Sequence, residues 1–148
     1  MEGYAVRFTA TIFAVTIFAS PGYAGCTLIG DSIAFEVARI VKECAVDAKS
    51  GLSSAQVIDR VHPDDVLFVS AGSNDWNNPR LEENLEAIRG RASARVVWIS
   101  PAPPVGAAAV DHIASFHGDG VIHFEVSPDM VHPESYEALA EQIREFLR

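Results

Sequence analysis

Short runs of apolar residues alternate along this chain with longer segments in which apolar residues recur every three or four positions. The short runs predict buried strands, and the recurring pattern predicts helices that bury one face. The predicted strands comprise residues 27–29, 45–48, 66–71, 95–100 and 121–126. The predicted helices comprise 33–43, 55–61, a helix that starts at Pro79 and includes Ile88, 106–116 and 134–148.

Strands that alternate with helices are typical of an α/β domain, in which helices cover both faces of a parallel sheet. Ligand sites of such sheets form beyond the carboxyl ends of the strands. Polar segments follow four of the predicted strands, at 31–32, 50–51, 72–78 and 129–132. We therefore expect these segments to meet at one edge of the sheet.

Ser32 stands at the junction between the first predicted strand and the first predicted helix. A serine at a helix start has two interpretations. It can cap the helix by accepting a hydrogen bond from a free backbone amide, or it can be a nucleophile held at the positive end of the helix dipole. The polar segments after the other strands favour the nucleophile, and one serine can serve both purposes.

A nucleophilic serine needs a general base, and His132 is the best candidate because it follows the last predicted strand. Asp129 precedes it by three residues, which places both side chains on the same side of a turn. Asp129 can then accept the Nδ1 proton and leave Nε2 directed at Ser32. The backbone amides of Ser32 and Gly51 and the side-chain amide of Asn74 are candidate donors to an oxyanion.

These residues stand in four short blocks, namely Gly30-Asp31-Ser32, Gly51, Gly72-Ser73-Asn74-Asp75 and Asp129-Met130-Val131-His132. Their content and order resemble those of the SGNH, or GDSL, hydrolase family over essentially the whole chain after residue 24. Ile33 stands where the family usually has leucine, and Gly51 is assigned only from its position after the second strand. The Gly-x-Ser-x-Gly motif is absent, which argues against the α/β-hydrolase fold.

The resemblance implies a flavodoxin-like three-layer α/β/α sandwich around a five-stranded parallel sheet of order 2-1-3-4-5. It implies Ser32 as nucleophile, His132 as base and Asp129 as the residue that orients it, with no metal ion and no cofactor. Ser32, Gly51 and Asn74 would form the oxyanion hole. Members of the family cleave carboxylic esters and thioesters, and some transfer acyl groups.

Asp31, Asp75 and Trp76 are the candidate substrate-binding residues. Asp75 has the alternative of holding its loop by accepting backbone amides, and Trp76 that of packing on the loop. Three further histidines, at 112, 117 and 123, match no zinc-ligand spacing.

The net charge of −9 and the absence of a basic cluster argue against nucleic acid and anionic membrane surfaces as partners. Residues 1–24 resemble a signal peptide, with the apolar run 8–19 and small residues that fit cleavage before Gly25. An uncleaved anchor or an interfacial helix is the alternative, although the apolar run is too short to span a bilayer. Residues 25–148 would then be one small exported domain without stable membrane insertion.

Cys26 and Cys44 precede the first two predicted strands. If these strands are parallel neighbours, the two cysteines lie within reach of a disulfide, which an exported protein can form. The competing interpretation is a lipid-modified Cys26, although Tyr23 stands where lipidation signals usually have leucine.

The sequence thus predicts an exported serine esterase that acts on small acyl groups, such as O-acetyl groups on carbohydrate, or on a short-chain lipid or thioester. The alternatives are an acyltransferase with the same residues and a non-catalytic binding domain of the cell envelope. The oligomeric state does not follow from the sequence.

Overall fold

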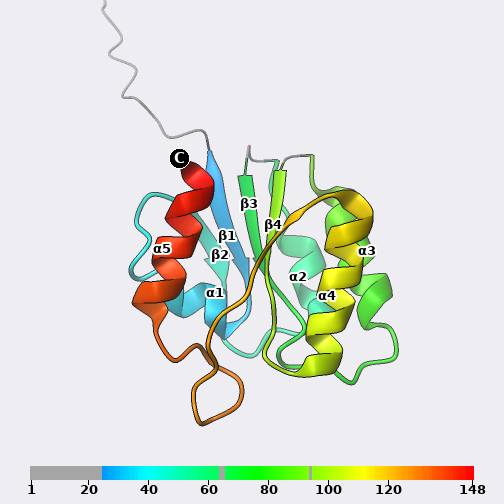
Figure 1. The fold of residues 1–148 in the computed structure, drawn as a ribbon. Helices are drawn as coiled ribbons and strands as arrows, with labels where there is room; N and C mark the ends of the chain where they lie inside the picture. Colours follow the sequence, from blue (N-terminus) through cyan, green and yellow to red (C-terminus); the bar gives the residue numbers. More distant parts are fainter. Residues whose placement is uncertain (1–24, 64–65, 94) are drawn as a thin grey trace, which may run out of the picture.

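The computed structural model describes residues 25–63, 66–93 and 95–148. Its centre is a five-stranded parallel sheet of order β2-β1-β3-β4-β5 (Figure 1). The strands are β1 (Cys26–Gly30), β2 (Ala45–Ala48), β3 (Val66–Ser70), β4 (Arg95–Ile99) and β5 (Gly120–Ile122). The helical segments are α1 (Ser32–Val37), α2 (Ser54–Val57), η1 (Ile58–Arg60), α3 (Leu81–Arg91), α4 (Pro104–His117) and α5 (Tyr136–Leu147). The predicted α/β architecture and strand order are confirmed.

Helices cover both faces of the sheet, and the sheet separates two hydrophobic cores. On one face, Leu28, Phe68 and Val97 pack with the apolar sides of α1 and α5. On the other face, Ile29 and Trp98 belong to a core shared with α2, α3 and α4. Figure 1 shows the same division, with α1 and α5 on one side of the strands and the other helices opposite. Successive strand residues point to opposite faces, so burial of both faces explains the continuous apolar runs.

The predicted ends of the first helix and of the last strand are wrong. Helix α1 ends at Val37 instead of continuing to residue 43, and tighter turns follow in which Arg39 and Ile40 donate to carbonyls three residues earlier. Val41 is nevertheless buried, so the apolar spacing outlasts the helix. Strand β5 ends at Ile122 instead of Val126, and the chain beyond it enters a loop closed by an antiparallel bridge between Val126 and Pro133.

The remaining helices begin close to the predicted positions. The start of α4 is Pro104, two residues early, because proline is tolerated in the first turn where its missing N–H costs nothing. The start of α5 is Tyr136, after Ser135 caps the helix by accepting from the amide of Ala138. The start of α3 is Leu81 instead of Pro79.

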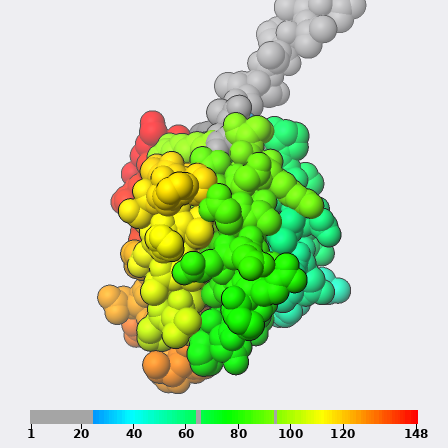
Figure 2. Space-filling view, turned by 90° about the vertical axis from the view of Figure 1, so that its right-hand side faces the viewer, coloured from blue at the N-terminus to red at the C-terminus, as the bar shows by residue number. Residues whose placement is uncertain are grey.

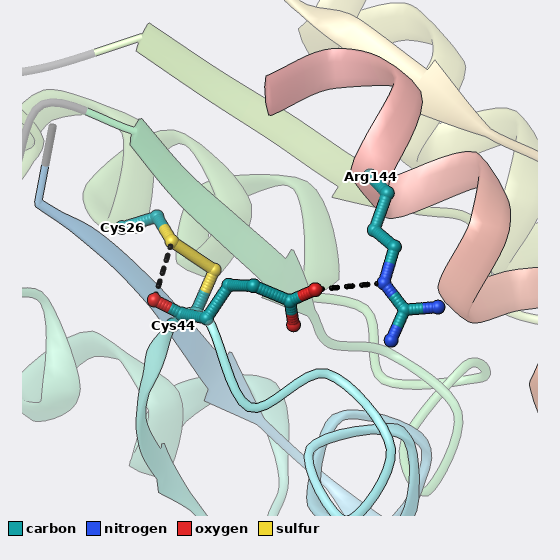
Figure 3. Close-up of a disulfide and its surroundings, with 4 residues drawn as sticks. Cys26, Cys44 and Arg144 are labelled. Atoms are coloured by element: carbon teal, nitrogen blue, oxygen red, sulfur yellow. Dashed lines mark hydrogen bonds and ion pairs between the residues drawn. A yellow bond between two sulfur atoms is a disulfide. The ribbon is translucent and has the colours of Figure 1, made fainter. Parts of the chain in front are cut away.

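The predicted disulfide between Cys26 and Cys44 is present, with Cα atoms 4.8 Å apart (Figure 3). It joins the beginnings of β1 and β2, which pair in parallel from Thr27 and Ala45 onward. Beside it, Nε of Arg144 on α5 donates to Glu43 at 2.9 Å. The bridge closes a separation of 18 residues, which stabilises such a loop by about 3 kcal/mol.

The signal-peptide interpretation concerns residues 1–24, which lie outside the described residues. Among the described helices, none combines the length and the apolar character needed to cross a bilayer.

Gly30 at the end of β1 is required by a close approach between strands. Its φ is +132°, and a Cβ atom there would lie 1.9 Å from the carbonyl oxygen of Ser70. We expect Gly30→Ala to lower the free energy of unfolding by about 3 kcal/mol or more, because strain and overlap add. Gly118→Ala is the matched control in urea denaturation, since Gly118 also has positive φ (+69°) but open space at its Cβ. Equal losses in the two variants would contradict the overlap.

Candidate active site

The hydroxyl of Ser32 lies at the carboxyl edge of the sheet and faces a histidine. Ser32 is the first residue of α1, directly after β1. Asp31, not Ser32, caps the helix, because its Oδ1 accepts from the amide of Ile33 at 3.1 Å. The capping interpretation of Ser32 is therefore wrong. Its Oγ lies 3.2 Å from Nε2 of His132, a residue 100 positions later in the chain.

Asp31 is fully buried, so the expectation that its side chain binds substrate does not fit this structure. Its Oδ1 also accepts from the Ser70 hydroxyl at 2.7 Å, and its amide donates to the Ser70 carbonyl at 3.1 Å. Burial raises the pKa of Asp31, and the hydrogen bonds from Ser70 and Ile33 oppose that rise. Asp31 thus ties the start of α1 to the end of β3 and fixes the backbone that carries Ser32.

His132 and Asp129 share one loop between β5 and α5. Nδ1 of His132 lies 2.6 Å from Oδ2 of Asp129. The other oxygen of Asp129 accepts from the amides of Val131 and His132, each at 2.9 Å, and from the hydroxyl of Ser127 at 2.7 Å. Asp129 therefore orients the imidazole with one oxygen and holds its own loop with the other.

The hydrogen bonds to Asp129 determine its ionisation. The donors, of which the His132 amide contributes most and the Ser127 hydroxyl next, hold the pKa of Asp129 well below its ordinary value of 3.8. Asp129 is therefore a carboxylate at any pH near neutrality. Folding lowers the pKa of Asp129, so its ionisation stabilises the folded state. This stabilisation is complete above pH 3.8, and it is lost as the pH falls through the pKa that Asp129 has in the folded protein.

The backbone of this loop adopts a constrained shape. The amide of Ser127 donates to the carbonyl of His132, and that of Glu134 donates to Glu125, which makes the segment resemble a hairpin. At its tip, Met130 has a φ of +64°, a value that residues other than glycine rarely adopt. The spacing of Asp129 and His132 places both on one side of this loop, as predicted.

The three candidate oxyanion donors follow the carboxyl ends of β1, β2 and β3, respectively. The Ser32 amide is at the first position of α1, where backbone N–H groups have no partner within the helix. Gly51 is exposed and has a φ of +83°. Nδ2 of Asn74 donates to the carbonyl of Leu52 at 2.9 Å, which joins the Gly51 loop to the Asn74 loop. An amide nitrogen carries two hydrogens, so Asn74 keeps one for a further acceptor.

Asp75 holds these loops together. Its Oδ1 accepts from the amide of Ser54 at 3.0 Å and its Oδ2 from the Ser54 hydroxyl at 2.6 Å. Asn78 also donates to Asp75, and Asn84 on α3 donates to the Ser54 hydroxyl at 2.8 Å. Both carboxylate oxygens are thus engaged within the protein, which supports the loop-holding interpretation of Asp75 over substrate binding.

Three residues that hold Asp129 and Asp75 through these hydrogen bonds were not identified from the sequence. Ser127 and Ser54 look like ordinary loop and cap serines, and only the fold brings them to Asp129 and Asp75. Asn84 lies among the charged residues of a predicted helix. Tyr136 belongs to the apolar face of α5, yet burial and the negative charges of Glu36, Asp31 and Asp129 raise its pKa to about 12.

Trp76 is 42% exposed and lines an apolar hollow beside the His132 loop. The interpretation of Trp76 as a substrate-binding residue stays a prediction. The three histidines at 112, 117 and 123 pair with Glu82, Glu86 and Asp111, respectively. Among the described residues, no three potential ligand side chains gather into a metal-binding group.

We expect Asn74→Ala to lower kcat for ester hydrolysis about 100- to 1000-fold, which is the usual effect of removing one oxyanion donor. The thermal midpoint and KM should change little, because the lost interaction acts in the transition state. Asn77→Ala is the matched control, as it removes an exposed amide from the same loop. If both variants kept wild-type kcat, Asn74 would not be an oxyanion donor.

A comparison with known proteins adds information about the fold. No protein-family model matches the chain, and a search of curated proteins finds no match. A candidate acylhydrolase from Bacteroides fragilis has a similar fold. The two structures superpose with a TM-score of 0.65 and 15% identity over 87% of this chain and 90% of that chain. The C-terminal catalytic domain of peptidoglycan O-acetyltransferase A from Streptococcus pneumoniae has a TM-score of 0.47 and 15% identity over 62% and 60% of the two chains.

Proposed function

We propose that this protein is a serine hydrolase of the SGNH type that cleaves carboxylic esters through an acyl-enzyme on Ser32. The observation that carries the proposal is the hydrogen-bonded chain from Ser32 Oγ through His132 to Asp129, with distances of 3.2 and 2.6 Å. A nucleophile, a base and an orienting carboxylate in this order are the requirement for acyl transfer to serine.

The reaction follows from this arrangement. Nε2 of His132 takes the Ser32 proton as Oγ attacks the acyl carbonyl, and the Asp129 carboxylate stabilises the resulting imidazolium. The carbonyl oxygen becomes an oxyanion, which the amides of Ser32, Gly51 and Asn74 stabilise. The imidazolium then gives its proton to the leaving alcohol. Water attacks the acyl-enzyme with His132 again as base, releasing the acid and restoring Ser32.

Small acyl groups are the proposed substrates, first an O-acetyl group on carbohydrate and second a short-chain lipid or a thioester. The side chains of His132 and Asp129 are 38% and 52% exposed, so the candidate site is open to solvent. An open site admits a bulky alcohol such as a carbohydrate, and it gives water access to the acyl-enzyme. The negative charge of the chain supports the exclusion of nucleic acid as a partner.

Export is part of the same proposal. The sequence pattern of residues 1–24 supports a signal peptide, with residues 25–148 as the mature hydrolase domain. The disulfide between Cys26 and Cys44 supports an oxidising compartment, where such bonds persist. A lipid-modified Cys26 would require a free thiol, which the disulfide removes.

The direct test is hydrolysis of p-nitrophenyl acetate and of acetylated xylan by residues 25–148, with Ser32→Ala as the control. The proposal predicts release of acetate by the wild type alone. Adding a sugar acceptor to the same reaction separates hydrolysis from transfer, because a transferase would acetylate the acceptor in place of water. A folded protein with no Ser32-dependent reaction on any ester or acceptor would support the non-catalytic binding domain.

A further inference from the structure

A polar hollow of about 520 Å³ adjoins the loop that carries Gly51. Leu52 connects the hollow to the candidate active site, because its carbonyl accepts from Nδ2 of Asn74 at 2.9 Å. Figure 2 shows the teal segment around residues 50–60 at the right-hand surface of the molecule, next to the green α3. The lining consists of charged and polar residues and one leucine, namely Asp47, Lys49, Leu52, Gln56, Asp59 and Arg60.

Lys49 carries an unpaired positive charge in this hollow. Every other lysine and arginine in the described part of the chain contacts a carboxylate or a backbone carbonyl, whereas the side chain of Lys49 is exposed and contacts neither. The amide of Lys49 donates to the carbonyl of Gly30 at 2.9 Å, two residues before Ser32. Lys49 also precedes Gly51 by two residues, so their Cα atoms lie within about 7 Å. A free cation thus belongs to the loop of a candidate oxyanion donor.

The two acidic side chains of the hollow are already balanced by cations. Asp47 forms an ion pair with Arg60, and its Oδ2 lies 2.9 Å from Nε2 of His62. The contact with His62, and Arg60 after it, hold the pKa of Asp47 below its ordinary value, so Asp47 is a carboxylate near neutrality. Asp59 accepts from Arg91 at 2.8 Å. The charge that remains in the hollow is therefore positive, although the whole chain is acidic.

Gln56 supplies a second donor to the hollow. Its Oε1 accepts from the amide of Ser53 at 3.0 Å and from the Ser53 hydroxyl at 3.2 Å. The NH₂ group of Gln56 donates to no atom of the described residues, so it remains for a ligand. An ammonium group and an amide NH₂ provide one donor for each oxygen of a carboxylate, and the charged donor favours that anion over a neutral hydroxyl.

We infer that Lys49 and Gln56 bind a carboxylate of the substrate, and that the enzyme favours acetylated carbohydrates that carry a uronate over neutral ones. The inference rests on the proposed function of the adjoining site. The net charge of −9 disfavours a polymer with many negative charges, whereas one lysine and one amide match a single carboxylate. The expected substrate is therefore a largely neutral acetylated polysaccharide with isolated uronate residues.

Acetylated glucuronoxylan oligosaccharides test the preference. Treatment of half of the sample with α-glucuronidase removes the uronate and leaves the acetyl groups in place. We expect kcat/KM for acetate release to be about two- to fivefold higher for the untreated oligosaccharides, the effect of one exposed ion pair. The difference should disappear in about 1 M sodium chloride, where the Debye length is about 3 Å. Equal values of kcat/KM at low salt would overturn the inference.

The two lysines of the sequence provide a matched pair of variants. Lys49→Gln removes the charge from the hollow, and Lys42→Gln makes the same change in net charge at an exposed position outside the lining. The ratio of kcat/KM for uronate-bearing to treated oligosaccharides should fall to about one in Lys49→Gln and keep the wild-type value in Lys42→Gln. Lys49→Glu should lower the ratio further, because it replaces attraction by repulsion. The same ratio in all four proteins would refute the assignment.

Binding to the Ser32→Ala protein separates this inference from the proposed function. Isothermal titration calorimetry should show that this protein binds the uronate-bearing oligosaccharides severalfold more tightly than the treated ones. Addition of Lys49→Gln should remove the difference. A difference in binding without hydrolysis by the wild type would refute the function and retain the carboxylate site. Wild-type hydrolysis of both substrates without a difference in binding would refute the carboxylate site alone.

Discussion

Ser32→Ala should reduce kcat for the hydrolysis of p-nitrophenyl acetate by roughly 10⁶-fold, as loss of the nucleophile does in other serine hydrolases. The physical reason is that no other hydroxyl stands against Nε2 of His132 in the described structure, whereas Ser32 Oγ lies 3.2 Å away. The initial rate under saturating ester, with the background subtracted, measures the effect.

The fold of Ser32→Ala should be unchanged, which makes the loss of activity interpretable. Asp31 caps α1, so removing the Ser32 hydroxyl leaves the cap in place. Its only side-chain partner in the described residues is His132. Circular dichroism and the urea midpoint should therefore match the wild type. A folded Ser32→Ala protein with near-normal turnover would exclude Ser32 as the nucleophile.

Asp129→Asn should lower kcat by about 10⁴-fold, the loss that follows when the orienting carboxylate of a serine protease becomes an amide. The introduced side chain would present an NH₂ group to Nδ1 of His132, where Asp129 now presents an oxygen at 2.6 Å. The imidazole would then adopt the tautomer with hydrogen on Nε2, which cannot accept the Ser32 proton. Steady-state kinetics at neutral pH measures the loss.

The rest of the loop provides the control for Asp129→Asn. The substituted side chain keeps an oxygen for the amides of Val131 and His132, so the loop should retain its shape. Ser127→Ala removes a different hydrogen bond to Asp129 and leaves the carboxylate facing His132. We expect Ser127→Ala to cost less than about tenfold in kcat, because the orienting contact is untouched. Comparable losses in the two variants would mean that the loop, and not the tautomer, accounts for the effect.

The pH dependence follows from the same contacts. The pKa of Asp129 lies well below its ordinary range, so Asp129 stays ionised at every pH near neutrality. A decline of kcat/KM between neutrality and about pH 5 should therefore contain no ionisation of Asp129, and Asp129→Asn should leave the shape of that decline unchanged.

The overall architecture could be predicted because its signals are local. Fully apolar strands require cover on both faces, and amphipathic helices between them supply it, so the sheet and its order follow from pattern and resemblance. The spacing of Asp129 and His132 could also be interpreted locally, because residues three apart in a turn share a side. Local pattern and family resemblance together predicted that His132 and Asp129 lie beside Ser32.

Other features depend on contacts that no local pattern reveals. Asp31 and Ser32 are adjacent and both favoured as caps, so only the position of Ser70 on β3 explains why Asp31 takes that role. Val126 continues the apolar alternation of β5, but its partner is Pro133, and the strand ends earlier. The role of Asp75 depends on Ser54 and Asn84, which lie on separate helices.

The most direct test of the central claim is to trap the acyl-enzyme. Residues 25–148 are mixed with p-nitrophenyl butyrate, quenched in acid within the first turnovers, digested and analysed by mass spectrometry. The proposed mechanism predicts a butyryl group on the peptide that contains Ser32, and its absence from the His132→Ala protein treated in the same way. A butyryl group on another residue, or hydrolysis by the wild type with no acylated peptide at any quench time, would contradict the account.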